Sequence, residues 1–147
     1  MALTIARPLK VWQKRVQSAV LSASGWYRKG YARKRLHDIS EGNAARTVDV
    51  EQDLLRLGSS IVPVLLWALE RDDFSEYQKR SIIRVLVGLG DARGLAALCR
   101  LVDDDSESLG KQARKDLRVL CLRLDRKGEL PEEYRPYLGR RDGTSER

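Results

Sequence analysis

Apolar residues recur along the second half of the chain at spacings of three and four, the period of an α-helix with one buried face. Near the end of the pattern this stripe consists of Leu109, Ala113, Leu117, Leu120 and Leu124. The same reasoning predicts helices at about residues 49–57, 60–71, 75–89, 92–102 and 107–124. No stretch alternates with period two, so the sequence predicts no strand.

The chain matches itself without gaps at an offset of 32 residues, which indicates an internal repeat. Leu57 and Gly58 fall on Leu89 and Gly90. The other matching positions are Leu66 with Leu98, Leu69 with Leu101, Asp72-Asp73 with Asp104-Asp105, Lys79 with Lys111, and Val85 with Leu117. A helix pair of this size cannot bury its apolar face alone, so we expect the pairs to stack as a short solenoid.

Residues that begin and end helices occur where the repeat places them. The stretches 49–52 and 75–78 start with Asp or Ser and end with Gln, which is the spacing of a capping box. In a capping box each of these two side chains accepts a hydrogen bond from the backbone N–H of the other residue. Gly58 and Gly90 each follow a leucine, as expected for residues that end a helix in the left-handed conformation.

The repeated unit resembles the HEAT repeat, in particular the short HEAT-like units of phycobilisome lyases. Its signature is a leucine-glycine turn, a first helix with paired leucines, an acidic turn, and a second helix that opens on basic residues. In this chain the matching residues are Leu89-Gly90, Leu98 with Leu101, Asp103 to Asp105, and Lys111 with Arg114. The resemblance covers about residues 48–124 and implies an all-α fold, a short HEAT-like α-solenoid of stacked antiparallel helix pairs.

The sequence therefore divides into a basic N-terminal helix and linker at 1–47, a HEAT-like repeat domain at 48–128, and a C-terminal cap with a polar tail at 129–147. No clear first helix precedes the first repeat in "LHDISEGNAARTVD", so residues 8–47 must supply the N-terminal cap in another form. Near the other end, Pro131 and Pro136 predict a short turn of helix that closes the array.

The net charge of +7 is concentrated in one segment. Residues 1–37 contain nine basic residues and no Asp or Glu, whereas the rest of the chain has 19 basic residues against 21 acidic ones. A segment with this charge attracts polyanions over roughly 8–10 Å at physiological salt. The longest apolar run, residues 61–69, is too short to cross a bilayer, which takes about twenty residues.

Residues 8–23 place apolar side chains on one helical face and basic ones on the other flank. Three interpretations of this segment are open. It can cap the solenoid, or lie on an anionic membrane surface with Trp12 and Trp26 at the headgroups. It can also belong to an organelle transit sequence, since residues 1–37 are rich in Arg and Ser and lack acids.

The segment 25–37 combines basic residues with aromatic rings. Basic side chains neutralise phosphates and flat rings stack on unpaired bases, so the segment is a candidate polyanion-binding arm. The alternative is a linker of solvated charge whose aromatic side chains pack on the repeats. The candidate residues are Trp26, Tyr27, Arg28, Lys29, Tyr31, Arg33, Lys34 and Arg35.

The resemblance to HEAT solenoids implies a second surface. There the second helix of each unit lines the concave face, which is the usual docking surface. By this resemblance the concave face carries Lys79, Arg80, Arg84, Lys111, Arg114, Lys115 and Arg118. The first helices and turns hold most of the acids, so a basic groove beside an acidic edge is expected. Exposed helices whose charged side chains form ion pairs with one another would show a similar charge pattern in the sequence.

The sequence offers little for catalysis. His37 is the only histidine and lies among cations, which favours a solvated side chain over a general base. Cys99 and Cys121 are 22 residues apart, which fits no common zinc site, and their apolar surroundings favour buried thiols over a disulfide. We therefore expect no catalytic residue, no metal, no cofactor and no small-molecule substrate.

These features favour a non-catalytic, cytoplasmic scaffold or adaptor that docks an acidic protein on a basic concave face. The first alternative is a protein that binds nucleic acid or an anionic membrane through the basic arm, with peripheral membrane association or organelle targeting through residues 1–24. The second alternative, an accessory subunit of a lyase or other modifying enzyme, depends on the family resemblance alone.

Overall fold

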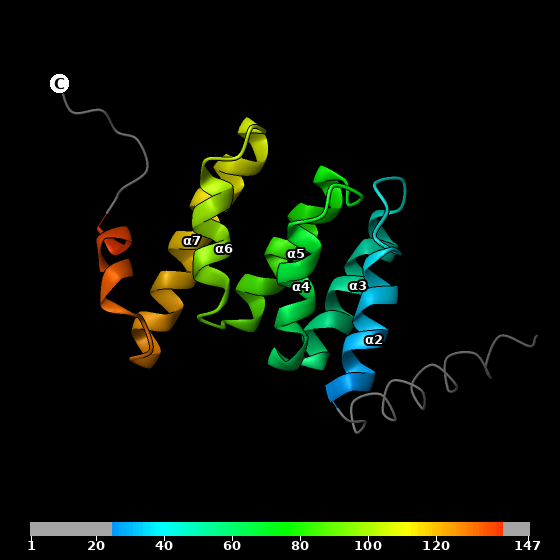
Figure 1. The fold of residues 1–147 in the computed structure, drawn as a ribbon, viewed down its shortest axis with the longest axis horizontal. Coiled ribbons are helices and arrows are strands. Elements are labelled where there is room, and N and C mark those ends of the chain that lie inside the picture. The colour runs from blue at the N-terminus through cyan, green and yellow to red at the C-terminus, as the bar shows by residue number, and fades with distance from the viewer. Residues whose placement is uncertain (1–24, 140–147) are drawn as a thin grey trace, which may run out of the picture.

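Every regular element of the described structure is a helix. The computed structural model describes residues 25–139 of the 147-residue chain, and it confirms the all-α class for that range (Figure 1). The predicted helix at residues 8–23 and the predicted polar tail at 140–147 lie outside it. In chain order the elements are α2 (Gly25–Leu36), α3 (Ala44–Leu57), η1 (Ser59–Ile61), α4 (Val62–Leu69), α5 (Glu76–Leu89), α6 (Gly94–Val102), α7 (Glu107–Lys127) and η2 (Glu132–Leu138).

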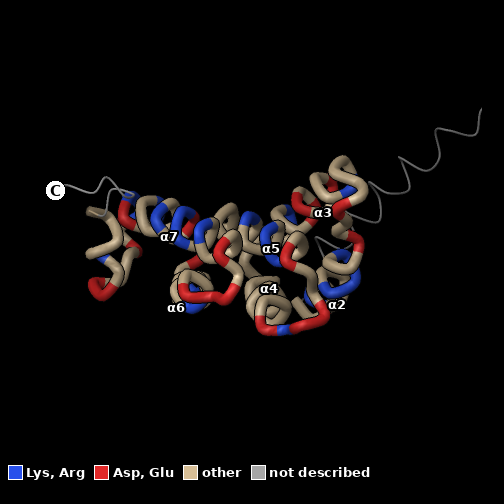
Figure 2. The backbone as a smooth tube through the Cα atoms, turned by 90° about the horizontal axis from the view of Figure 1, so that it is seen from above, with Lys and Arg blue, Asp and Glu red and all other residues tan. Residues whose placement is uncertain are grey.

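The helices run alternately up and down in a row and lie in two layers (Figures 1 and 2). One layer holds α2, α4 and α6, and the other holds α3, α5 and α7; neighbours within each layer contact one another, as do α2 with α3, α4 with α5, and α6 with α7. The apolar stripes meet between the layers. Side chains with no exposed surface there include Leu54, Leu65, Ile82, Leu98 and Leu120.

The predicted spacing of 32 residues recurs in the helix bounds. Adding 32 to the first and last residue numbers of α3 gives the bounds of α5, and adding 32 to the first residue number of α4 gives the start of α6. Gly58 and Gly90, which follow α3 and α5, have φ angles of 76° and 64°. Only Gly90 has the predicted left-handed conformation, because Gly58 combines its positive φ with a ψ of −167°. Both conformations favour glycine, which lacks a Cβ.

One predicted capping box is confirmed and the other is wrong. The Ser75 hydroxyl accepts a hydrogen bond from the N–H of Gln78 at 3.1 Å, and the Gln78 side chain accepts one from the N–H of Ser75 at 2.9 Å. The second box was expected at residue 49, but α3 begins at residue 44. The Asn43 side chain caps that start by accepting from the N–H of Arg46 at 3.0 Å.

A helix precedes α3 where the sequence showed no clear first helix. α2 lies in the basic segment itself and contacts α3, η1 and α4. Among the described helices it stands at one end of the row, so the other described helices cover only one of its sides (Figure 1). Ala32 and Leu36 are therefore its only buried residues, too few to produce an apolar stripe.

The other end of the row is covered by η2, which confirms the predicted short turn of helix after Pro131. η2 contacts α7, and Tyr134 and Tyr137 pack against the core. α7 extends three residues beyond the predicted end and stops at Gly128, which has a φ of 71°.

Both cysteines are free thiols, as predicted. Cys121 is buried, and its burial, with a smaller contribution from the nearby Cys99, raises the pKa of Cys121 to about 11. Cys99 is half-buried, and its thiol donates a hydrogen bond to the hydroxyl of Tyr137 at 3.7 Å.

Candidate partner-binding surfaces

The predicted docking residues come from two neighbouring helices of one layer, α5 and α7. Figure 2 shows basic residues along both helices and acidic residues at the turns that join α4 to α5 and α6 to α7. All seven side chains are exposed or half-buried. They are Lys79, Arg80 and Arg84 on α5, and Lys111, Arg114, Lys115 and Arg118 on α7.

The α5 cations are largely engaged within the chain. Arg84 forms an ion pair with Glu51 of α3 at 2.7 Å. Arg80 forms one with Glu76 at 2.6 Å and donates a hydrogen bond to Ser108 of α7. Lys79 is five residues before Arg84, so it lies about 140° around the helix axis from it and does not share its face. The three α5 residues therefore do not form one free basic surface.

Three of the four predicted α7 cations are more available, whereas Arg118 is half-buried. Lys111 pairs with Glu107 at 2.9 Å, but both side chains are largely exposed, so the pair contributes little. Arg114 and Lys115 are exposed and form no ion pair with any residue between 25 and 139. Val119 and Leu122 follow them with 37% and 39% of their surface exposed. We call these five residues, Lys111, Arg114, Lys115, Val119 and Leu122, the α7 outer face.

Polar contacts hold α7 against α5. The Gln112 side-chain amide donates to the carbonyl oxygen of Arg80 at 3.2 Å and to the Asp116 carboxylate at 3.3 Å. About three turns further along α7, Arg123 donates to the carbonyl oxygen of Val87 at 2.7 Å. Hydrogen bonds to backbone carbonyls fix the rotation of α7, so the α7 outer face has a defined orientation.

The Asp116 carboxylate destabilises this contact at neutral pH. Burial raises the pKa of Asp116, and the hydrogen bond from Gln112 and the charges of Lys115 and Arg84 offset the rise only in part. A raised pKa means that the folded protein holds this proton more tightly than the unfolded chain does. The buried charge therefore lowers the free energy of unfolding only at pH values above the unfolded pKa of 3.8.

We expect Asp116→Asn to raise Tm at pH 7, because asparagine keeps an acceptor for Gln112 without the buried charge. Thermal unfolding followed by circular dichroism tests this. The gain should shrink as the pH falls through the raised pKa of Asp116 and should vanish below 3.8, where the wild-type carboxyl group is protonated in both states. A lower Tm for the variant at pH 7 would contradict the assignment.

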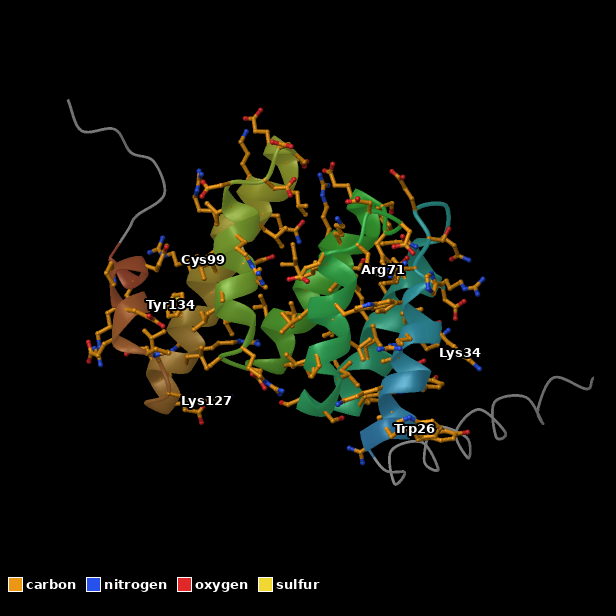
Figure 3. All side chains as sticks on the ribbon, viewed as in Figure 1. Trp26, Lys34, Arg71, Cys99, Lys127 and Tyr134 are labelled. Carbon is orange, nitrogen blue, oxygen red and sulfur yellow. The ribbon has the colours of Figure 1, made fainter. Side chains whose placement is uncertain are left out.

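The arm residues lie on α2, and some of them point to solvent. Trp26 and Tyr27 are 82% and 55% exposed at the start of the helix. Figure 3 shows Trp26 at the lower end of α2 and Lys34 projecting away from the row. A pocket of about 460 Å³ is lined, among described residues, by Trp26, Tyr27, Lys29, Gly30, Tyr31, Arg33 and Lys34.

Other arm residues hold α2 in place. Arg35 forms ion pairs with Asp38 at 2.7 Å and with Asp53 of α3 at 2.8 Å, and Asp53 is only 9% exposed. Burial alone would raise the pKa of Asp38, but the hydrogen bonds and charges of Arg35 and Arg46 outweigh it and lower that pKa. Burial, then the charge of Asp53, raises the pKa of Tyr31.

The structure also shows a cation–aromatic stack that sequence reasoning missed. The guanidinium groups of Arg33 and Arg71 lie 5.0 Å and 4.8 Å from the ring centre of Trp67. Phe74 meets the same ring edge-on at 6.0 Å. The stack joins α2 to α4 and the turn that follows. No sequence signal pointed to it, because Arg33 and Trp67 are far apart in the chain.

Little in the described range has the arrangement of a catalytic centre. His37 is exposed, and its ring stacks on Phe74 at 4.9 Å. Between residues 25 and 139 no group of three or more His, Cys, Asp or Glu side chains could hold a metal ion. Within the same range, no helix combines the length and apolar character needed to span a bilayer.

Comparison with known proteins does not identify a family for this chain, because no family model, no curated protein and no solved structure matches it.

Proposed function

We propose that the protein is a non-catalytic adaptor built of three HEAT-like repeats, formed by α2 with α3, α4 with α5, and α6 with α7. The repeated helix bounds at 32 residues, the leucine-glycine turns and the two helix layers support this interpretation. Each pair exposes an apolar side that only a neighbouring pair can cover, which favours stacking of like units. The free thiols of Cys99 and Cys121 fit a reducing compartment, so the proposal places the adaptor in the cytoplasm.

The adaptor binds an acidic segment of a partner protein on the α7 outer face. The observation that carries this is the combination of Arg114 and Lys115, exposed and without an ion pair to any residue between 25 and 139, with the exposed side chains of Val119 and Leu122 on the same helix. α7 as a whole has seven basic residues and three acidic ones. Cations beside small apolar groups fit a partner segment that carries carboxylates and a few apolar side chains.

We expect the double reversal Lys111→Glu and Lys115→Glu to lower the affinity for the partner by about a hundredfold, because carboxylates would then face carboxylates. Complexes captured on the full-length protein from the cells that make it, compared by quantitative mass spectrometry, identify the partner and measure its loss. Both side chains are exposed, so the circular dichroism spectrum should be unchanged.

The matched control is the pair Lys29→Glu and Lys34→Glu on α2, which changes the net charge by the same amount at two exposed lysines of the opposite end. The partner should be retained by this control. Equal loss from both variants would mean that net charge alone governs the capture. Retention by the Lys111 and Lys115 variant would place the docking surface elsewhere.

A further inference from the structure

The outward side of α2 has a composition distinct from every other exposed surface between residues 25 and 139. It joins the two most exposed aromatic side chains, Trp26 and Tyr27, to the exposed cations Lys29 and Lys34. α2 contains five basic residues and no acidic one, and Arg35 is paired with the carboxylates of Asp38 and Asp53. We call Trp26, Tyr27, Lys29 and Lys34 the α2 outer face.

These side chains lie close enough to act together. The rings of Trp26 and Tyr27 meet edge-to-face with centres 6.4 Å apart. Both rings and both lysines line the same pocket. In helical projection the lysines lie on either side of Trp26 and Gly30, so the cations flank the centre of the face. A Cβ placed on Gly30 would have no atom within 4 Å, so this centre is open.

Aromatic rings flanked by cations suit the interface of a bilayer. Trp and Tyr are enriched where an apolar body meets a polar layer, and Lys side chains pair with headgroup phosphates. Among the described helices α2 is the last of the row, and Trp26 and Tyr27 on its outer side are exposed (Figure 1). The sequence preceding it adds four basic residues and no acid within residues 1–24, which gives the same end of the chain more positive charge.

We propose that the α2 outer face binds an anionic lipid bilayer, with Trp26 and Tyr27 at the headgroup level and Lys29 and Lys34 against the lipid phosphates. This site is separate from the α7 outer face and lies at the other side of the row from α7 (Figure 1). A nucleic acid is favoured less, because the edge-to-face rings do not form a parallel platform on which successive bases could stack.

The test is co-sedimentation of the full chain with vesicles of phosphatidylcholine, with and without one quarter phosphatidylglycerol, in 0.1 M salt. Binding to the anionic vesicles alone, weakening as salt is added, is expected. Each basic residue near an anionic surface contributes about a factor of five, so Lys29→Gln with Lys34→Gln should weaken binding about twenty-five-fold. Trp26→Ala with Tyr27→Ala should weaken it about tenfold.

Lys111→Gln with Lys115→Gln removes the same two charges from α7 and should leave vesicle binding unchanged. Equal binding to neutral vesicles, or equal losses from the α2 and α7 charge variants, would overturn the proposal. The proposal would also be overturned if the variant with Trp26→Ala and Tyr27→Ala bound anionic vesicles as well as the wild type does. If the protein binds a 20-nucleotide single strand tightly but does not bind vesicles, and the α2 variants lose this binding, the face would instead be assigned to nucleic acid. None of these outcomes depends on whether the partner of the α7 outer face exists.

Discussion

Replacing Leu120 by alanine will lower the free energy of unfolding by about 3 kcal/mol. Leu120 belongs to α7 and has no exposed surface. It lies where three helices meet: a Cβ on Gly94 of α6 would be 3.4 Å from Leu120 and 3.8 Å from Leu86 of α5. Because Gly94 has no side chain that could move into the space, α6 can fill its side of the cavity only by shifting its backbone.

Urea unfolding followed by circular dichroism measures this loss, and Tm should fall by about 10 °C. The control is Leu122→Ala, the same change two residues further along the same helix, where the side chain is 39% exposed. That variant should lose less than about 1 kcal/mol. Equal losses at residues 120 and 122 would show that α7 does not pack as described.

Arg35→Ala will lower the free energy of unfolding by about 2 kcal/mol, although Arg35 lies in the most basic stretch of the chain. Its guanidinium group bridges Asp38 and Asp53, and it ties α2 to α3. Without it the carboxylate of Asp53, which is 9% exposed, loses its shortest ion pair and keeps weaker interactions, among them those with Arg56 at 3.6 Å and with Tyr31. Removing one member of such a pair costs more than the pair contributes, because the remaining charge has lost its compensation.

Chemical unfolding at pH 7 tests this prediction, with Lys34→Ala as the control. Lys34 is the neighbouring residue but is exposed, so its loss should change stability by less than about 0.5 kcal/mol. The lowered pKa of Asp38 adds a pH signature. The stability that this ion pair contributes is fully present above the unfolded value of 3.8 and is lost as the pH falls through the lower folded pKa. The difference between wild type and Arg35→Ala should therefore narrow in acid.

The repeat was predictable because its signals are local. Leu54, Leu86 and Leu120 belong to stripes that any α-helix with one buried face must have, and Gly90 and Ser75 satisfy helix ends within a few residues. α2 gave no such signal, since an end helix needs few buried residues. The start of α3 was missed because a single asparagine caps it, without the returning side chain that makes a capping box recognisable.

The candidate surfaces were predictable in composition but not in availability. The sequence shows that Arg84 and Arg35 are basic, but their partners Glu51 and Asp53 are 33 and 18 residues away. Which cations are neutralised therefore depends on how the helices stack. Lys115 and Lys34 stay available because no acidic side chain of the described range lies within ion-pair distance of them.

The contact of Trp67 with two guanidinium groups has a spectroscopic consequence. One cation comes from α2 and the other from the chain segment after α4, so the surroundings of the indole change when α2 moves away from α4. With Trp12 and Trp26 replaced by phenylalanine, Trp67 is the sole source of indole emission. Its wavelength and quenching by iodide would then report the detachment of the first helix during unfolding, separately from the loss of the rest of the row.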